Sequence, residues 1–111
     1  MQIASHSHGD TLILEIGAPR LDALNAVAAQ AALAQQLVPG AKRVVLDLGA
    51  VNYVSSAGLR TIVQVAKQVA AAGGRTALCS VQQPVREIVS IAGFDTMLPM
   101  VAGRAEALGA W

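Results

Sequence analysis

The chain opens with an alternation of apolar and polar residues that is typical of β-strands. Residues 11–16 (TLILEI) show the pattern strongly, and residues 2–8 (QIASHSH) show it more loosely. The pair Gly9-Asp10 between them is a compact turn signal, so the two stretches are predicted to form a β-hairpin. Residues 43–48 (RVVLDL) are mostly apolar, which is expected of a central strand covered on both faces.

In the alanine-rich residues 21–37, the spacing of the apolar residues is that of a helix and no longer that of a strand. Its apolar residues recur every three or four positions and predict a buried stripe formed by Ala26, Ala29, Leu33 and Leu37. Asp22 is well placed to cap this helix by accepting backbone N–H bonds, and Pro39-Gly40 is expected to end it.

A longer helix is predicted over residues 56–72, and Gly73-Gly74 is expected to end it. The apolar spacing predicts a buried face that consists of Leu59, Ile62, Val63, Ala66, Val69 and Ala70. Arg60, Gln64 and Lys67 follow one another at spacings of four and three, so they share a polar face that is left for solvent or a partner.

The elements that follow are shorter. Residues 75–79 predict a strand, residues 97–101 a last strand, and residues 104–108 a last helix. Between them, Pro84 marks the first turn of a helix whose predicted buried residues are Val85, Ile88, Val89 and Ala92. This alternation predicts an α/β fold with a mixed, mostly parallel sheet of about five strands, an N-terminal hairpin and about four helices.

The composition agrees with a single domain, residues 1–111, and limits the classes of partner. The hydrophobic fraction is 54% but only 3% is aromatic, so the core is expected to consist of Val, Leu, Ile and Ala. The formal charge is +1 and the basic residues are scattered singly, which disfavours a nucleic-acid partner. No apolar run approaches the roughly 20 residues of a membrane span, and no signal peptide is visible, so a cytoplasmic protein without membrane insertion is expected.

Few residues are candidates for a metal or catalytic site. His6 and His8 lie two positions apart in a predicted strand, but no third ligand accompanies them, so exposed strand residues are expected. The single Cys79 excludes an internal disulfide and is expected to be a small buried hydrophobe. Asp47, near the end of its strand, is expected to bind loop N–H groups in a structural role. No catalytic residue, metal or cofactor is predicted.

The chemistry of the chain concentrates at Ser55 and Ser56, where the long helix begins. One interpretation is helix capping, which contributes about 0.5–2 kcal/mol. Nucleophilic catalysis is disfavoured for two reasons. A hydrolase elbow needs a glycine where Val54 stands, and its histidine base is lacking because His6 and His8 lie on the predicted hairpin. The third interpretation is phosphorylation, since a phosphate at a helix N-terminus meets free N–H groups and a favourable dipole. The residues alone leave capping and phosphorylation open.

Residues 46–59 (LDLGAVNYVSSAGL) closely resemble the signature of STAS domains, specifically those of bacterial anti-sigma-factor antagonists. Residues 21–26 (LDALNA) are similar to the start of the first helix in that family. Residues 85–98 (VREIVSIAGFDTML) are similar to its third helix and last strand. The resemblance covers essentially the whole chain and implies the STAS fold.

The resemblance implies a regulatory binding protein and not an enzyme. Such antagonists bind an anti-sigma factor that is also a serine kinase, and this frees the sigma factor for transcription. The kinase inactivates the antagonist by phosphorylating the serine that corresponds to Ser56, and a metal-dependent serine phosphatase reverses the reaction. The family's usual aspartate before that serine is Ser55 here, which makes Ser55 a rival acceptor, and the family's second serine is Ala57.

The partner is expected to contact the rim around the start of the long helix. The expected contact residues are Asp22, Asn25, Ser55, Ser56, Gly58, Arg60, Gln64 and Lys67. For the last three, an ordinary solvated surface is an equally good interpretation. An alternative function within the family is a STAS subunit of a membrane transport complex or of a larger stress-signalling assembly. A nucleotide-binding or hydrolytic enzyme is disfavoured, because no glycine-rich phosphate loop occurs.

Overall fold

The computed structural model describes residues 1–37 and 41–111, and within them a five-stranded sheet forms the centre of the fold. The strands lie in the order β1 (Ile3–His8), β2 (Thr11–Ile16), β4 (Arg43–Asp47), β6 (Arg75–Cys79) and β7 (Met100–Val101). The β1–β2 pair is antiparallel, and the other neighbouring pairs are parallel. The predicted α/β class, with a mixed, mostly parallel sheet and an N-terminal hairpin, is confirmed.

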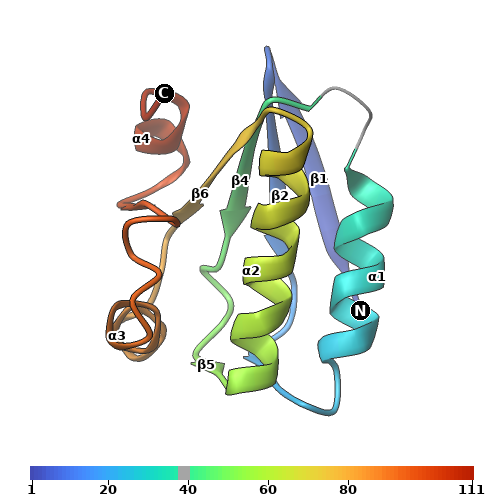
Figure 1. Ribbon diagram of the computed structural model, residues 1–111, viewed down its shortest axis with the longest axis vertical. Coiled ribbons are helices and arrows are strands. Elements are labelled where there is room, and N and C mark those ends of the chain that lie inside the picture. The colour runs from blue at the N-terminus through green and yellow to red at the C-terminus, as the bar shows by residue number, and fades with distance from the viewer. Residues whose placement is uncertain (38–40) are drawn as a thin grey trace.

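The described residues also form the four predicted helices, α1 (Ala26–Gln36), α2 (Ser56–Ala71), α3 (Gln83–Ile91) and α4 (Arg104–Leu108). Helices α1 and α2 stand side by side in front of the sheet, and α3 and α4 lie toward its β6 side (Figure 1). The expected end of the first helix at Pro39-Gly40 lies outside the described residues.

Alternation along β2 separates the main core from a smaller cluster on the other face of the sheet. Leu12, Leu14 and Ile16 belong to the main core, which α1, α2 and α3 complete. Ile13 points the other way, into a cluster that includes Cys79 of β6 and Ala107 of α4. The sheet therefore carries the long helices on one face and α4 on the other.

A short parallel pair, β3 (Arg20–Leu21) and β5 (Tyr53–Val54), lies outside the main sheet. The sequence patterns do not predict this pair, because two residues are too few to show a period. Its effect is to hold the segment before α1 against the segment before α2. The starts of both helices are thereby brought to the same end of the molecule (Figure 1).

The end of α2 follows the prediction. Gly73 has φ +85°, a left-handed conformation that favours glycine, and the Lys42 Nζ donates a hydrogen bond of 2.8 Å to the carbonyl oxygen of Ala72. A cation at this position also complements the negative end of the helix dipole.

The burial of two alanines was predicted wrongly. Ala70 is exposed because it borders a hollow between α2 and β6, and Ala92 is exposed because it is the C-cap residue of α3. On α2, Thr61 and Val65 are buried instead, in addition to the other predicted core residues. A methyl side chain carries too little apolar surface to decide which face a helix buries.

The last strand is shorter than residues 97–101, which were predicted to form it. Only Met100 and Val101 pair with β6. Pro99 has no N–H to give to a sheet, and the N–H of Leu98 donates to the carbonyl oxygen of Phe94 at 2.8 Å in a turn. The segment that resembles the family's third helix and last strand therefore ends before the strand begins.

Candidate functional site

The start of α2 is fixed by Ser55. This residue is the N-cap, with extended backbone, and its Oγ accepts a hydrogen bond of 3.3 Å from the N–H of Gly58. Its own N–H donates to the carbonyl oxygen of Leu21 at 2.9 Å, which joins the cap to β3. The capping interpretation is confirmed for Ser55.

Ser56 is the first residue of α2, and its side chain is exposed, whereas Ser55 is half-buried. Within the described residues the Ser56 hydroxyl forms no hydrogen bond. The serines therefore differ, because the Ser55 hydroxyl stabilises the helix and the Ser56 hydroxyl is exposed without a hydrogen bond to the described residues.

Gly58 is buried where α2 crosses β3. A Cβ atom placed on it would lie 2.3 Å from the carbonyl oxygen of Leu21, which is far inside van der Waals contact. A side chain at position 58 would thus push the helix away from the strand. The structure places this predicted contact residue inside the molecule, where it sets the position of the serines without reaching the surface.

Asp22 and Asn25 stabilise the turn before α1. The Asn25 Oδ1 accepts from the backbone N–H of Asp22 at 2.9 Å, and its Nδ2 donates to the carbonyl oxygen of Arg20 at 2.7 Å. The Asp22 carboxylate accepts from the N–H of Leu24 at 3.0 Å. The prediction that Asp22 caps the helix is wrong, because α1 begins at Ala26 and Asp22 lies one turn too early.

Several large apolar side chains around this site are exposed. Leu24 is 95% exposed, Val27 84% and Ile91 86%, and Tyr53 on β5 is 40% exposed. Sequence reasoning missed them, although Leu24 and Val27 fall outside the predicted stripe of the first helix. Single exposed apolar residues are common, but Tyr53 and Ile91 line one hollow with Ser56, and Leu24 and Val27 lie at the start of α1.

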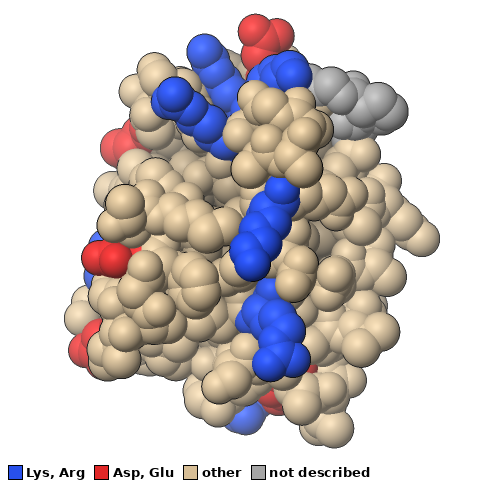
Figure 2. Space-filling model, in the orientation of Figure 1, with Lys and Arg blue, Asp and Glu red and all other residues tan. Residues whose placement is uncertain are grey.

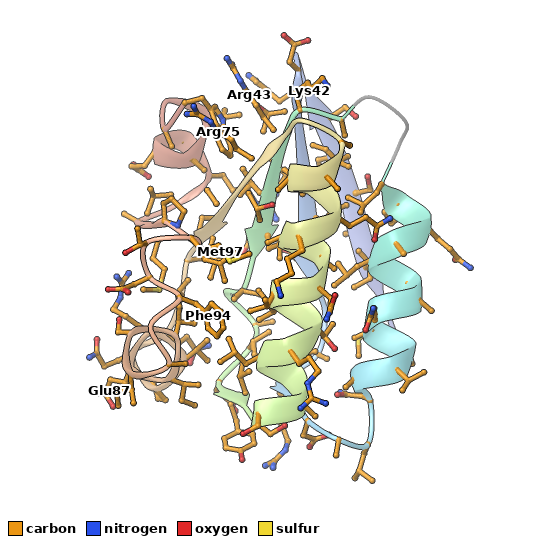
Figure 3. The ribbon with its side chains drawn as sticks, viewed as in Figure 1. Lys42, Arg43, Arg75, Glu87, Phe94 and Met97 are labelled. Carbon is orange, nitrogen blue, oxygen red and sulfur yellow. The ribbon has the colours of Figure 1, made fainter. Side chains whose placement is uncertain are left out.

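A groove runs along α2 from the free serine. This α2 groove has a volume of about 340 Å³ and is lined by Ser56, Leu59, Arg60, Val63, Gln64, Lys67 and Phe94. Phe94 follows α3 and lies between that helix and α2 (Figure 3). The predicted exposure of Arg60, Gln64 and Lys67 is confirmed, and the three side chains line one hollow with Ser56.

Ser56 also borders a second surface hollow, on the α3 side. This α3 hollow, of about 360 Å³, is lined by Tyr53, Val54, Ser55, Ser56, Leu59, Ile88, Ile91 and Ala92. Its lining is apolar apart from the serines and the Tyr53 hydroxyl. Ser56 therefore stands between a basic groove and an apolar hollow.

The basic side chains near the site are differently engaged. Basic atoms follow the face of α2 in a line (Figure 2), and this helix contributes Arg60 and Lys67, which form no ion pair with any described residue. Arg20 by contrast binds Asp22 at 3.3 Å and lies 4.7 Å from the centroid of the Tyr53 ring.

Other basic side chains lie far from the serines. Lys42, Arg43 and Arg75 gather at the opposite end of the molecule, near the C-terminus of α2 (Figure 3). They stand where β4 and β6 begin, and Arg43 and Arg75 are paired across these strands. The length of α2 separates this second basic group from the serines.

Asp47 has the expected structural role. Its Oδ1 accepts from the N–H of Gly49 at 2.9 Å, and its Oδ2 accepts from the Nε of Arg104 at 2.6 Å. Arg104 also donates to Glu15 at 2.8 Å, so α4 is tied to the ends of β2 and β4. Burial raises the pKa of the neighbouring Cys79 thiol, and the Asp47 carboxylate raises it further.

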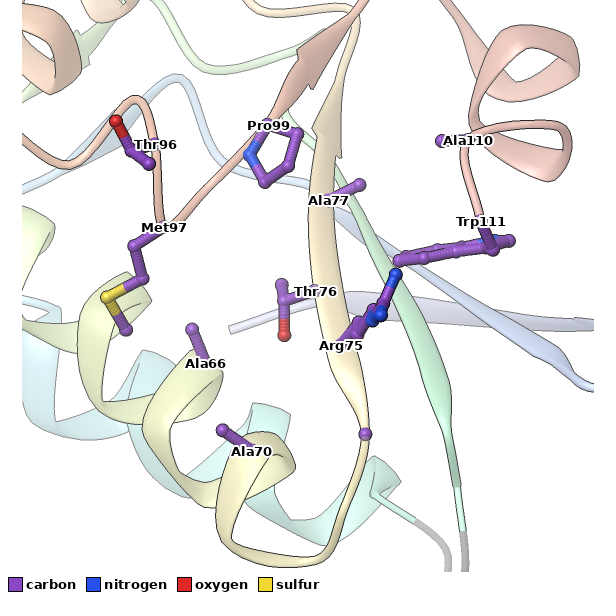
Figure 4. Close-up of a pocket in the computed structure, with 11 residues that line it drawn as sticks. Ala66, Ala70, Arg75, Thr76, Ala77, Thr96, Met97, Pro99, Ala110 and Trp111 are labelled. Carbon is purple, nitrogen blue, oxygen red and sulfur yellow. The ribbon is translucent and has the colours of Figure 1, made fainter.

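A separate cavity of about 270 Å³ lies between α2 and the open edge of β6 (Figure 4). Thr76 points into it toward Ala66 and Ala70, and Trp111 lies on the other side of β6. The buried Thr76 Oγ1 and Trp111 Nε1 have no hydrogen-bond partner among the described residues. This cavity is remote from Ser56, since it borders the last turns of α2.

Neither a metal site nor a membrane span is found in the part of the chain that the structure describes. No three His, Cys, Asp or Glu side chains gather there, and His6 and His8 are exposed on β1. No described helix has the length and apolar character needed to cross a bilayer.

Residues 2–107 match the STAS domain family. The protein BtrV of Bordetella bronchiseptica, classed by its name as an anti-sigma factor antagonist, is 42% identical over 91 residues, which cover 82% of this chain and 78% of BtrV.

Solved structures agree in fold. The Thermotoga maritima protein TM1081 superposes with a TM-score of 0.88 at 23% identity, covering 96% of this chain and 92% of that one. An anti-sigma-factor antagonist (STAS) domain protein from Planctomyces limnophilus gives a TM-score of 0.79 at 25% identity, covering 97% and 95%. The phosphorylated form of the Bacillus cell fate determinant SpoIIAA gives 0.70 at 15% identity, covering 97% of each chain. By its sequence match and its fold, the chain belongs to the STAS domain family.

Proposed function

We propose that this chain is an anti-sigma factor antagonist that acts in the cytoplasm by binding and not by catalysis. Its partner is an anti-sigma factor with serine kinase activity, whose capture frees a sigma factor for transcription. The resemblance of residues 46–59 to the antagonist signature and the 42% identity to BtrV support this function. Phosphorylation of Ser56 ends the binding, and a serine phosphatase restores it.

The observation that carries the proposal is the different state of the adjacent hydroxyls. Ser56 is exposed and its hydroxyl is free of hydrogen bonds to the described residues, while the Ser55 hydroxyl caps α2. The Ser55 hydroxyl is half-buried and engaged in the cap, whereas the Ser56 hydroxyl is exposed and can be reached without disturbing the cap. Ser56 is therefore the favoured acceptor of the pair.

The modification has a simple chemical balance. The γ-phosphoryl group of ATP is transferred to the Ser56 Oγ, the serine proton is released, and ADP leaves. The product gains a charge of about −1.5 to −2 at neutral pH. The start of α2 tolerates this charge because its dipole and N–H groups favour anions, so the domain stays folded. A partner packed on the α3 hollow would instead meet a strongly hydrated group in an apolar contact.

The proposed contact surface surrounds Ser56. Arg60, Gln64 and Lys67 line the α2 groove and are available for direct contact. Asp22 and Asn25 act mainly through the turn that they stabilise, which presents Leu24 to solvent. We add Leu24, Val27 and Ile91 to the predicted contacts, because burying such side chains gives roughly 1.5–3 kcal/mol each.

The test uses the purified chain and the anti-sigma kinase encoded in the same genome. Incubation with ATP should add one phosphate by intact mass, and Ser56→Ala should remove the modification. Ser55→Asp is the matched control, since aspartate is an equally good N-cap and offers no hydroxyl, so it should still be phosphorylated. Phosphate on the Ser56→Ala variant, or mapping to Ser55, would contradict the assignment. Binding to a transport component in place of the kinase would favour the alternative function.

A further inference from the structure

Ser56 and Arg60 are neighbours on the surface of α2. They are four residues apart in the helix, a spacing that brings side chains to within about 5–6 Å at their Cβ atoms. Both are exposed, and both line the α2 groove. An anionic group that precedes a cation by four residues has the favoured orientation for a helical ion pair.

Arg60 is an uncommitted cation one helical turn from Ser56. It forms no ion pair with a described residue. Arg20, by contrast, forms an ion pair with Asp22 and lies over the Tyr53 ring. The side chains that α3 and its cap present to Ser56 are the apolar Ile88, Ile91 and Ala92. A charge added to Ser56 therefore faces the guanidinium of Arg60, which is free of ion pairs among the described residues.

We propose that phosphate on Ser56 is held by Arg60 in the same helix, and that this ion pair withdraws Arg60 from the partner. The inference rests on the proposed function for its biological meaning, and it specifies how modification of this site is read. The phosphate then weakens partner binding in two ways. It competes with the partner for Arg60, and it places a charge in the apolar contact at the α3 hollow.

The same geometry specifies the chemistry of the partner. In the unmodified chain the α2 groove combines two cations, Arg60 and Lys67, with the apolar ring of Phe94. This combination fits an acidic segment that carries an apolar side chain, with carboxylates on the cations and the apolar group against the ring. A phosphate of about two negative charges at Ser56 cancels the charge of the groove.

The ion pair can be tested without a kinase or a partner. Phosphoserine is placed at position 56 during synthesis of the full chain, and the phosphorus resonance is followed by NMR as a function of pH. A free phosphoserine has its second ionisation near pH 6. The nearby guanidinium should lower this midpoint by roughly 0.2–0.4, in keeping with an exposed helical ion pair.

Matched variants locate the cause. Arg60→Gln should raise the midpoint by that amount, to the value that the helix N-terminus alone gives, and Arg60→Lys should keep most of the effect. Lys67→Gln and Arg20→Gln remove the same charge from other positions and should leave the midpoint within about 0.1, because Lys67 lies about three turns along α2 and Arg20 is paired with Asp22. An unchanged midpoint in Arg60→Gln, or an equal rise in either control, would overturn the proposal.

The result is separable from the fate of the proposed function. If the kinase phosphorylates Ser56 but Arg60→Gln does not move the midpoint, the switch stands and the ion pair fails. If no kinase modifies the chain, a midpoint that depends on Arg60 still establishes the ion pair. Circular dichroism of each variant excludes a folding defect, since every substituted side chain is exposed.

Discussion

The Nε of Arg104 lies 2.6 Å from the Oδ2 of Asp47, and this hydrogen bond ties α4 to the end of β4 across 57 residues of sequence. The Asp47 side chain is only 9% exposed, while Arg104 remains 37% exposed. The bond to Asp47 raises the pKa of the guanidinium further above its already high ordinary value. Arg104 therefore stays positively charged throughout the physiological pH range.

Replacing Arg104 should destabilise the fold. The Arg104→Gln variant leaves a nearly buried Asp47 carboxylate with the single partner Gly49 and also frees Glu15. We expect a loss of about 1–2 kcal/mol in the free energy of unfolding, moderated by the exposure of the arginine. Urea unfolding followed by circular dichroism measures it. Arg60→Gln, which breaks no ion pair, should change the value by less than about 0.5 kcal/mol.

A side chain at position 58 should displace the first turn of α2 from β3. Gly58→Ala forces its Cβ against the Leu21 carbonyl, so either β3 or the first turn of α2 must move. Overpacking of this kind costs about 1–3 kcal/mol, which the thermal midpoint will report. Phosphorylation of Ser56 should slow as well, because the serine is displaced with the helix. Wild-type stability in Gly58→Ala would show that the contact is relieved at no cost.

The buried thiol should make stability fall at alkaline pH. The pKa of Cys79 is raised by burial and then by Asp47, so the unfolded chain loses the thiol proton first. The stabilisation is complete below the unfolded pKa of about 8.5 and is lost as pH rises through the folded pKa. The slope approaches about −1.4 kcal/mol per pH unit in that window. Cys79→Ala should lack this component of the slope, whatever its absolute stability, and an identical slope would refute the prediction.

An aspartate at position 56 should separate binding from folding. Ser56→Asp places one negative charge at the start of α2, which the helix dipole favours, so the thermal midpoint should stay within a few degrees. Affinity for the anti-sigma partner should fall at least about tenfold, since a charge enters an apolar contact. Differential scanning calorimetry measures the thermal midpoint, and isothermal titration calorimetry measures the affinity. A large drop in the midpoint would instead assign the hydroxyl a structural role.

Local patterns were sufficient for most of the fold. The hairpin, the central strands and the helices follow from periodicity and turn residues, because each is specified by side chains close together in sequence. The short β3–β5 pair depends on tertiary contacts. The start of β7 at Met100, later than predicted, depends on Pro99. The serine pair was found because its two hydroxyls stand at a predicted helix start.

Other parts of the site could not be predicted, for a physical reason. Apolar residues in a sequence are expected to be buried, so the exposure of Leu24, Val27 and Ile91 becomes visible only when no other element covers them. The clamp of Arg104 on Asp47 and Glu15 joins residues 57 and 89 positions apart, which no local pattern encodes. Asp22 was placed in a cap because its residue type fits one, although the helix begins a turn later.

The hydrogen-bonded turn of Asp22 and Asn25 has a consequence for kinetics. Its backbone is fixed by bonds of 2.9, 2.7 and 3.0 Å in the free chain, and it holds Leu24 out into solvent. The conformational entropy of this loop is lost once, when the chain folds, and is not lost again on association. A partner that binds here meets a rigid loop, so no slow rearrangement limits the encounter and its rate is set by diffusion and orientation.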